Sequence, residues 1–153
     1  MLLTAVISLG LLSLVHGQCA LKTVAFTAAL SHSQTVDNNQ VVVYDNTITN
    51  HGLGYDNKTG IFTAPAEGFF LFHLHLLKTK NQEAWLELFH NDDLIVSAYA
   101  QNSTQFDAAG NSVILWVMAG DRVDIRAHRL SGLFGKPDEL YTTFSGHYVG
   151  AKS

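Results

Sequence analysis

Residues 68–77 read GFFLFHLHLL, the most apolar run of the chain outside its N-terminus. Successive side chains of a β-strand point to opposite faces, so a strand formed here would be apolar on both faces. His73 and His75 would share one of those faces, about 7 Å apart. The run therefore presents two alternatives: a pair of metal ligands, or histidines packed on an apolar strand.

The chain from Val24 onward is a series of short β-like segments separated by turn residues. The segments lack the 3.6-residue apolar period of a helix, which predicts an all-β domain. Residues 91–92 (Asn-Asp) and 119–121 (Ala-Gly-Asp) suit tight turns, and 31–40 and 132–139 suit exposed connections. The expected strands are 24–30, 41–44, 60–63, 69–78, 84–89, 94–100, 112–118, 122–128 and 141–149.

Two of the expected strands differ in their pattern. In 122–128 inward apolar residues alternate with outward polar ones, which predicts an outer or edge strand with one face in water. The inward set is Val123, Ile125 and Ala127, and the outward set is Asp124, Arg126 and His128. Residues 112–118, SVILWVM, are apolar on both faces like 68–77. A second layer or another subunit must cover such a face, and two such strands favour an oligomer.

The first 17 residues, MLLTAVISLGLLSLVHG, have the apolar centre and small terminal residue of a secretory signal peptide. No Lys or Arg precedes the apolar centre, so an uncleaved anchor is the alternative, although about 14 apolar residues are few for a bilayer span. Cleavage would leave a short segment, 18–23, and one globular domain, 24–150, secreted to the extracellular space. No later stretch predicts a membrane span.

Three further residues bear on a secreted chain. Cys19 is the single cysteine and directly follows the predicted cleavage site. An odd cysteine bridges to another subunit or stays a free or capped thiol, and both alternatives are open. Asn57 and Asn102 begin two sequons in polar, turn-like stretches, which predicts N-glycosylation.

The composition argues against two classes of protein. A formal charge of −4 with 14% charged residues does not suit a nucleic-acid binder, which needs clustered Lys and Arg. A zinc enzyme would need a third ligand for His73 and His75, from His90, His128 or His147. No Glu or Thr has an evident role beside them, and the chain has no Gly-x-Ser-x-Gly elbow. We therefore expect a protein that is not an enzyme.

The residues leading into the apolar run have a regular spacing. They are Tyr44, Asn50, Tyr55, Phe62, Gly68, Phe70, Phe72 and Leu74. This spacing resembles the aromatic signature of the complement C1q globular domain, which usually has Phe at the position of Tyr44, Tyr at that of Phe70 and an aromatic residue at that of Leu74. The segments HNDD (90–93), GNSVILWV (110–117), AGDRV (119–123) and TTFSGHYV (142–149) follow in the family's order, so the resemblance covers 23–149.

The resemblance implies a ten-stranded jelly-roll β-sandwich of the C1q and TNF type that assembles as a homotrimer through its apolar strands. The candidate residues for the trimer seam are Phe70, Phe72, His73, His75 and Trp116. The chain has no Gly-X-Y collagen stalk. The resemblance therefore implies a lectin-like pattern-recognition protein of innate immunity that binds microbial or cell-surface glycans, as a trimer that Cys19 could link into larger forms. A cytokine- or hormone-like ligand of a cell-surface receptor is the alternative.

The resemblance also implies candidate sites. Several C1q-like domains bind calcium in the loop that corresponds to 100–111, and Gln101 and Asp107 are the calcium candidates, although Ala100 replaces an expected acidic residue. The candidate ligand-binding residues are Arg126, His128 and Arg129, whose donors suit carboxylated or sulfated glycans. In a seam, His73 and His75 would either sense pH or only fill space.

Overall fold

A computed structural model of the chain describes residues 23–152. The predicted signal peptide, 1–17, and Cys19 lie outside the described residues. Residues 23–152 form twelve β-strands in two antiparallel sheets, without a helix. The prediction of an all-β sandwich is therefore confirmed. The resemblance implies ten strands, and four of the twelve have only two or three residues.

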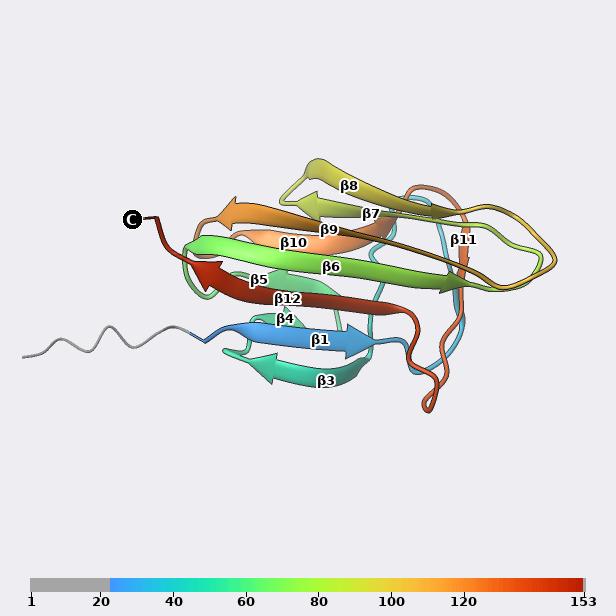
Figure 1. The fold of residues 1–153 in the computed structure, drawn as a ribbon, viewed down its shortest axis with the longest axis horizontal. Helices are drawn as coiled ribbons and strands as arrows, with labels where there is room; N and C mark the ends of the chain where they lie inside the picture. Colours follow the sequence, from blue (N-terminus) through green and yellow to red (C-terminus); the bar gives the residue numbers. More distant parts are fainter. Residues whose placement is uncertain (1–22, 153) are drawn as a thin grey trace, which may run out of the picture.

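The two sheets form the layers of the sandwich (Figure 1). The seven-stranded sheet has the order β2-β11-β6-β12-β1-β3, with β9 also paired to β6. Its strands are β1 (Ala25–Ala29), β2 (Gln34–Val36), β3 (Asn46–His51), β6 (Gly68–Lys78), β9 (Asp107–Val117), β11 (Ser131–Leu133) and β12 (Thr143–Gly150). The five-stranded sheet has the order β4-β5-β10-β7-β8, with β4 (Tyr55–Asp56), β5 (Ile61–Thr63), β7 (Ala84–His90), β8 (Asp93–Ala100) and β10 (Arg122–Ala127).

An aromatic core fills the space between the sheets. The Phe26 ring stacks on Phe62 with centroids 4.9 Å apart, and Phe62 meets Phe72 edge to face at 5.5 Å. Phe144 of β12 closes the cluster against Phe26 at 4.9 Å. These rings are fully or almost fully buried. Because aromatic side chains bury more apolar area than any others, this cluster supplies much of the hydrophobic stabilisation in a domain whose described residues hold no cysteine.

The spaced signature residues have structural roles in the same region. The side-chain amide of Asn50 donates to the backbone carbonyl of Tyr55 at 2.7 Å and its oxygen accepts the Tyr55 amide at 3.2 Å. The Tyr55 hydroxyl donates to the Tyr44 carbonyl at 3.0 Å and accepts the Tyr44 amide at 3.2 Å. Gly68 has φ +152°, and a Cβ there would lie 2.3 Å from the ring of Tyr148. Two features of the fold thus account for part of the spacing: the hydrogen-bonded turn between Asn50 and Tyr55, and the close approach of Gly68 to Tyr148 of β12.

Several sequence expectations about the strands are wrong. Residues 41–44 make only an isolated bridge, Val41 to Arg126, because the Tyr44 amide bonds to a side chain rather than to a neighbouring strand. Conversely, β2 lies inside the expected exposed connection 31–40, and β11 extends into 132–139. Strand β9 starts at Asp107 rather than Ser112, since all eleven of its residues pair with β6.

The prediction of a wet outer strand at 122–128 is also wrong. Strand β10 lies between β5 and β7, and Asp124 is only 1% exposed. The alternation places Asp124 on the outward face as expected, but the Arg126 side chain pairs with it and shields it from water. Pattern therefore predicts the side of the sheet to which a residue points, and its neighbours decide whether water reaches it.

Candidate functional site

The outward side of the seven-stranded sheet carries the first candidate surface. Strand β6 turns alternate residues outward, and the register sets these beside outward residues of β9 and β12. Trp116 lies opposite Phe69, with ring centroids 5.0 Å apart, and Ile114, opposite Leu71, is 58% exposed. We call this surface the histidine face, and it comprises Phe69, Leu71, His73, His75, Ile114, Trp116 and His147. Large apolar side chains remain partly in water there, as they do on an uncovered interface.

The predicted seam residues divide between the two sides of β6. Phe70 and Phe72 are 0% exposed and point into the aromatic core, so their assignment to a seam is wrong. The strand alternates, and these two phenylalanines have the opposite parity from the histidines. His73, His75 and Trp116 do lie on the outward side. The missed neighbours Phe69, Leu71 and Ile114 complete the apolar part of the histidine face.

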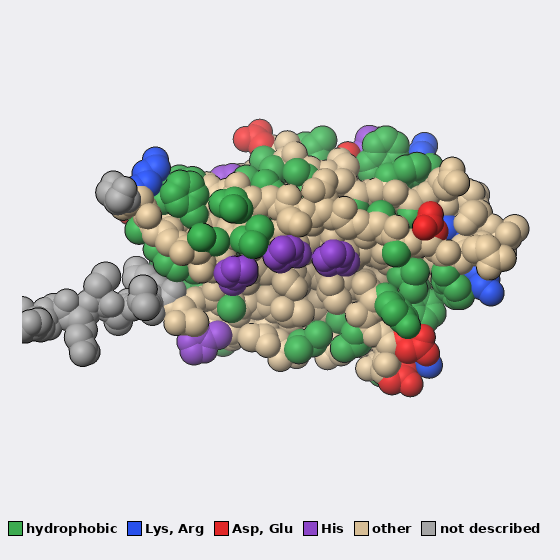
Figure 2. All heavy atoms as spheres, viewed as in Figure 1, with side chains coloured by type: hydrophobic (Ala, Val, Ile, Leu, Met, Phe, Trp, Pro, Cys, Tyr) green, Lys and Arg blue, Asp and Glu red, His purple; other side chains and the backbone are tan. Residues whose placement is uncertain are grey.

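Three imidazoles form a row across the histidine face (Figure 2). The His73 ring lies 6.4 Å from that of His75 and 6.5 Å from that of His147, with interplanar angles of 14° and 23°. Rings that stack at this spacing do not converge on one point, whereas zinc needs its ligand nitrogens about 2 Å from a common centre. Across 23–152, no three His, Cys, Asp or Glu side chains are grouped to hold a metal.

The other two proposed zinc partners are far from this row in the fold. His90 ends β7 and His128 directly follows β10, both in the five-stranded sheet, and each bonds a carboxylate. His90 Nε2 lies 2.8 Å from Asp121 Oδ2, and His128 Nδ1 lies 2.9 Å from Glu87 Oε1. Because His147 lies in the row without converging on the other two rings, the zinc alternative has no third ligand in place among residues 23–152.

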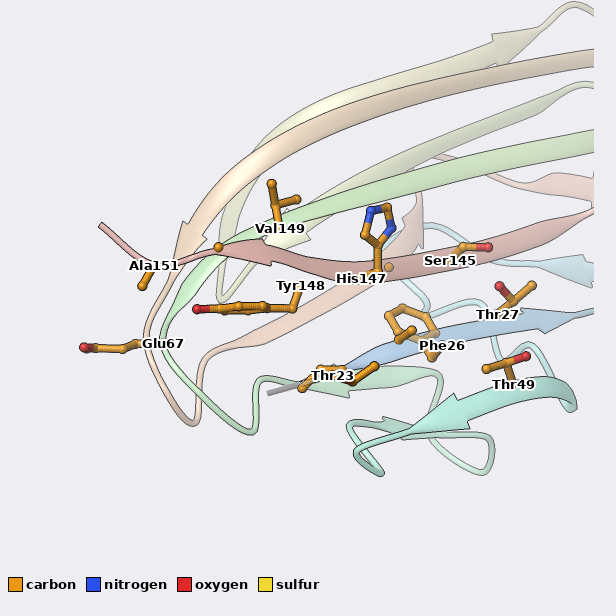
Figure 3. Close-up of a pocket in the computed structure, with 14 residues that line it drawn as sticks. Thr23, Phe26, Thr27, Thr49, Glu67, Ser145, His147, Tyr148, Val149 and Ala151 are labelled. Carbon is orange, nitrogen blue, oxygen red and sulfur yellow. The ribbon is translucent and has the colours of Figure 1, made fainter. Parts of the chain in front are cut away.

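A groove of about 930 Å³ adjoins the histidine row. It runs over β1 and β12, and Figure 3 shows Thr27, Thr49, Ser145 and His147 projecting from β1, β3 and β12 along it. Val24 and Val149 supply apolar lining, and Glu67 lies at one end. The histidine face thus has both protruding apolar side chains and a recess, the two complementary features that a symmetric assembly needs.

The opposite side of the sandwich carries the predicted ligand-binding cations. Arg126 Nε lies 2.7 Å from Asp124 Oδ1, and Arg126 Nη2 donates to Asp124 Oδ2 at 3.1 Å and to the Asn91 carbonyl at 3.0 Å. The hydrogen bond to Asp124 raises the pKa of Arg126 above its usual range. The guanidinium also lies over the Phe89 ring, 4.3 Å from its centroid. Because its Nε and Nη2 donors are occupied, Arg126 is suited to holding the sheet rather than a ligand.

His128 and Arg129 lie in a separate aromatic cluster. The His128 ring stacks on Trp85 with centroids 4.1 Å apart, and the Arg129 guanidinium lies 5.1 Å from the Trp85 ring and 5.9 Å from the Tyr99 ring. Arg129 Nε pairs with Glu83 at 2.8 Å, and the Tyr99 hydroxyl donates to the same carboxylate at 3.2 Å. We call Glu83, Trp85, Glu87, Tyr99, His128 and Arg129 the Trp85 cluster.

The Trp85 cluster is accessible and prearranged. The side chains of Arg129 and His128 are 48% and 46% exposed, and Tyr99 is also exposed. The indole nitrogen of Trp85 is buried without a hydrogen-bond partner among residues 23–152. Sequence reasoning missed Trp85, Tyr99 and the two glutamates, although alternation in EAWLELF (83–89) sets Glu83, Trp85 and Glu87 on one side.

The predicted calcium residues lie beside a buried ammonium. Asp107 is exposed and accepts the Ala108 amide at 2.9 Å, and Gln101 is exposed. Lys78 is 0% exposed, and its Nζ donates to backbone carbonyls of Thr79, Ser103 and Gln105. One carboxylate and one amide fall short of the six or more oxygens that calcium requires, and the inner carbonyls of this loop already bind a cation.

The two predicted glycosylation sites are exposed. Asn57 lies in the turn after β4, where its side-chain amide donates to the Asp45 carbonyl at 3.3 Å. Asn102 lies in the loop between β8 and β9. Glycosylation at both asparagines stays a prediction. Among the described residues, no helix is long and apolar enough to cross a membrane.

Comparison with known proteins decides the family. The family model of the C1q domain matches residues 25–149. The chain belongs to the C1q domain family. Mouse complement C1q tumor necrosis factor-related protein 6 is 32% identical over 114 residues, which are 72% of this chain and 43% of the mouse protein. Zebrafish Caprin-2 is 35% identical over 128 residues, which are 80% of this chain and 14% of Caprin-2. This chain thus spans less than half the length of these relatives.

Solved structures agree on the fold. The globular domain of zebrafish complement 1qA protein superposes with a TM-score of 0.69 at 19% identity, covering 84% of this chain and 99% of that one. The Eiger TNF of S. frugiperda superposes with a TM-score of 0.68 at 11% identity, covering 86% and 96%. This chain therefore has the jelly-roll sandwich of the C1q and TNF type, as the family resemblance implies.

Proposed function

We propose that this protein is a secreted homotrimeric recognition protein that assembles through the histidine face and binds glycans through the Trp85 cluster. The observation that carries the proposal is the contrast between the two sides of the sandwich. One side exposes apolar side chains beside a groove, and the other exposes a hydrogen-bonded aromatic cluster. Assembly through the first side leaves the second in solvent on every subunit.

The chemistry of the Trp85 cluster supports a sugar ligand. Sugar rings present apolar C–H faces that pack on aromatic planes and hydroxyls that bond carboxylates and guanidinium groups. Tyr99 and His128 offer planes, and Glu83, Glu87 and Arg129 surround them. Arg129 and His128 are already bonded to Glu83 and Glu87, which favours neutral glycans over the carboxylated or sulfated ones that the sequence alone suggests.

A trimer would multiply weak binding. Three identical sites on one particle engage a repetitive microbial or cell-surface glycan with a high effective concentration, so avidity exceeds the affinity of one site. A disulfide through Cys19 would join trimers into larger forms and extend the same effect. A non-reducing gel of the secreted protein, compared with a Cys19→Ser variant, tests that link: loss of high-mass bands in the variant is expected.

A receptor ligand is the second candidate. The 32% identity to a complement C1q tumor necrosis factor-related protein favours it, because that relative shares most of this domain. Both functions use the same fold, so the fold does not choose between them. Cell binding that survives glycosidase treatment but is lost after protease treatment would favour the receptor ligand.

A glycan array tests the recognition proposal. The secreted full-length protein is applied to neutral, sialylated and sulfated glycans, with and without EDTA. We expect saturable binding that EDTA does not alter and that an Arg129→Ala variant weakens about tenfold. Lys58→Ala, which removes an exposed cation from the turn after β4, is the matched control and should bind like the wild type. No saturable binding at high protein concentration would exclude the lectin function.

A further inference from the structure

The histidine row differs from most other histidines of the described chain in its lack of acidic partners. His32, His90 and His128 each lie within 4 Å of a carboxylate. The three row imidazoles make ring contacts with one another, but none makes a hydrogen bond or ion pair within residues 23–152. A carboxylate neighbour stabilises imidazolium, so the row has no local compensation for positive charge.

The elements around the row add little compensating charge. Outward positions of β1 and β12 beside it are Ala25, Thr27, Thr143 and Ser145, and those of β9 are Gly110, Ser112 and Ile114. The charged or titratable groups at the margins are Glu67, His51, Asp107, Tyr141 and Lys152. Lys152 Nζ lies 4.7 Å from the Trp116 ring centroid, so the Trp116 end of the histidine face also carries a cation.

The apolar side chains of this surface are indifferent to pH, whereas its imidazoles are not. Ile114, Trp116 and Leu71 favour a dry contact at any pH. Imidazoles behave as weakly polar side chains when neutral, and histidine in general titrates between about pH 5 and 8. Protonation would place three positive charges in a line at spacings of 6.4 and 6.5 Å, and enclosing them in a subunit contact would remove their hydration.

We propose that the row of His73, His75 and His147 makes self-association through the histidine face pH-dependent, with the trimer favoured near neutral pH and dissociated in mild acid. This inference rests on the proposed trimer and concerns the regulation of its interface. Dissociated subunits take up protons that the assembled seam excludes, so by linkage the association constant falls as pH falls. Three histidines per subunit act together, which makes the response steep.

The experiment measures the oligomeric state of the wild-type protein by sedimentation velocity at about pH 7.5 and about pH 5.5. We expect a trimer at the higher pH and a dissociation constant at least tenfold larger at the lower pH. A His73→Gln/His75→Gln/His147→Gln variant should remain a trimer at both values. Because these side chains lie on the surface of the subunit, circular dichroism should show an unchanged fold. A His51→Gln variant, altered on the neighbouring β3, should keep the wild-type response.

The outcomes separate the two proposals. A wild-type protein that is monomeric at both pH values overturns the trimer and this inference with it. A trimer whose dissociation constant is the same at both values overturns the inference and leaves the trimer standing. A triple variant that still dissociates in acid shows that other groups cause the pH dependence, and it overturns the inference while leaving the trimer standing. If the triple variant fails to fold, the single His75→Gln variant, which alters one end of the row, replaces it. The change in its dissociation constant between the two pH values should then be smaller than in the wild type, and an equal change overturns the inference.

Discussion

The ammonium nitrogen of Lys78 lies 2.9 Å from the carbonyl oxygen of Ser103, inside the protein. The same nitrogen donates to the carbonyl of Thr79 at 3.2 Å and to that of Gln105. Ser103 and Gln105 belong to the loop between β8 and β9, in which the resemblance to calcium-binding relatives predicts a metal site. A tethered ammonium group therefore occupies the inner carbonyls of this loop.

Replacing Lys78 should loosen this loop and destabilise the domain. A Lys78→Met variant keeps the apolar stem but leaves three carbonyl groups without their donor, and we expect the free energy of unfolding to fall by about 2–3 kcal/mol. Urea denaturation measures the change. Lys58→Met, which alters an exposed lysine in the turn after β4, should change stability by less than about 0.5 kcal/mol. A rise in the Tm of the wild type on adding millimolar Ca²⁺ would contradict the metal-free account.

Arg126 should contribute to stability rather than to ligand binding. An Arg126→Ala variant leaves Asp124, 1% exposed, without its partner, and we expect the free energy of unfolding to fall by about 3 kcal/mol. Glycan binding by the folded variant should be unchanged. Arg122→Ala, at an exposed position of the same strand, is the control for both measurements. If Arg126→Ala costs no more than this control, the pair behaves as an exposed surface ion pair.

The parts of the fold that sequence predicts well are the strands with a long run of apolar residues on their core side. The expected strand 69–78 nearly coincides with β6, and 84–89 with β7, because their core sides are continuously apolar. Strand β3, NTITNH, is polar and half exposed at the edge of the sheet, so only its pairing with β1 makes it a strand. Residues 41–44 are the reverse case, apolar in sequence but bonded partly to a side chain.

The candidate sites depend on register, which is why sequence predicts them only in part. His73 and His75 are visible as a pair within one strand, but His147 joins them only because β12 pairs with β6. In the same way, Trp85, Tyr99 and His128 come from β7, β8 and the end of β10, and no spacing along the chain links them. The Arg126 and Arg129 side chains look alike in sequence, and only their neighbours distinguish a structural guanidinium from an exposed one.

The stability of the turn before β10 should depend on pH through Asp121. Its carboxylate accepts the Met118 amide at 2.8 Å, and His90 and Asn91 also bond it. The Met118 hydrogen bond, with those of His90 and Asn91, holds the pKa of Asp121 below its usual range. A group with a lowered folded pKa stabilises the fold above its unfolded value, about 4, and that contribution is lost as pH falls through the folded value.

An Asp121→Asn variant should therefore be less stable than the wild type by about 1–2 kcal/mol at neutral pH, and the difference should shrink below about pH 4. Urea denaturation at a series of pH values measures it. Asp93→Asn, which alters an exposed carboxylate at the start of β8, should match the wild type throughout. A difference that stays constant into acid would show that the charge of Asp121 is not its source.

Tyr44 and Tyr55 should respond in opposite directions to loss of their hydroxyls. The Tyr55 hydroxyl bonds both the amide and the carbonyl of Tyr44, whereas the Tyr44 hydroxyl is buried with no partner among residues 23–152. Burial raises the pKa of both tyrosines, so both hydroxyls stay protonated and polar in the core. A buried hydroxyl without a bond costs free energy, and removing it relieves that cost.

Tyr44→Phe should raise the free energy of unfolding by about 1 kcal/mol, and Tyr55→Phe should lower it by about 1–2 kcal/mol. Phenylalanine is the usual residue of the C1q signature at position 44, in keeping with that direction. Guanidinium denaturation of the two single variants measures both changes, and a Tyr44→Phe variant less stable than the wild type would mean that its hydroxyl has a partner in solution, such as a buried water.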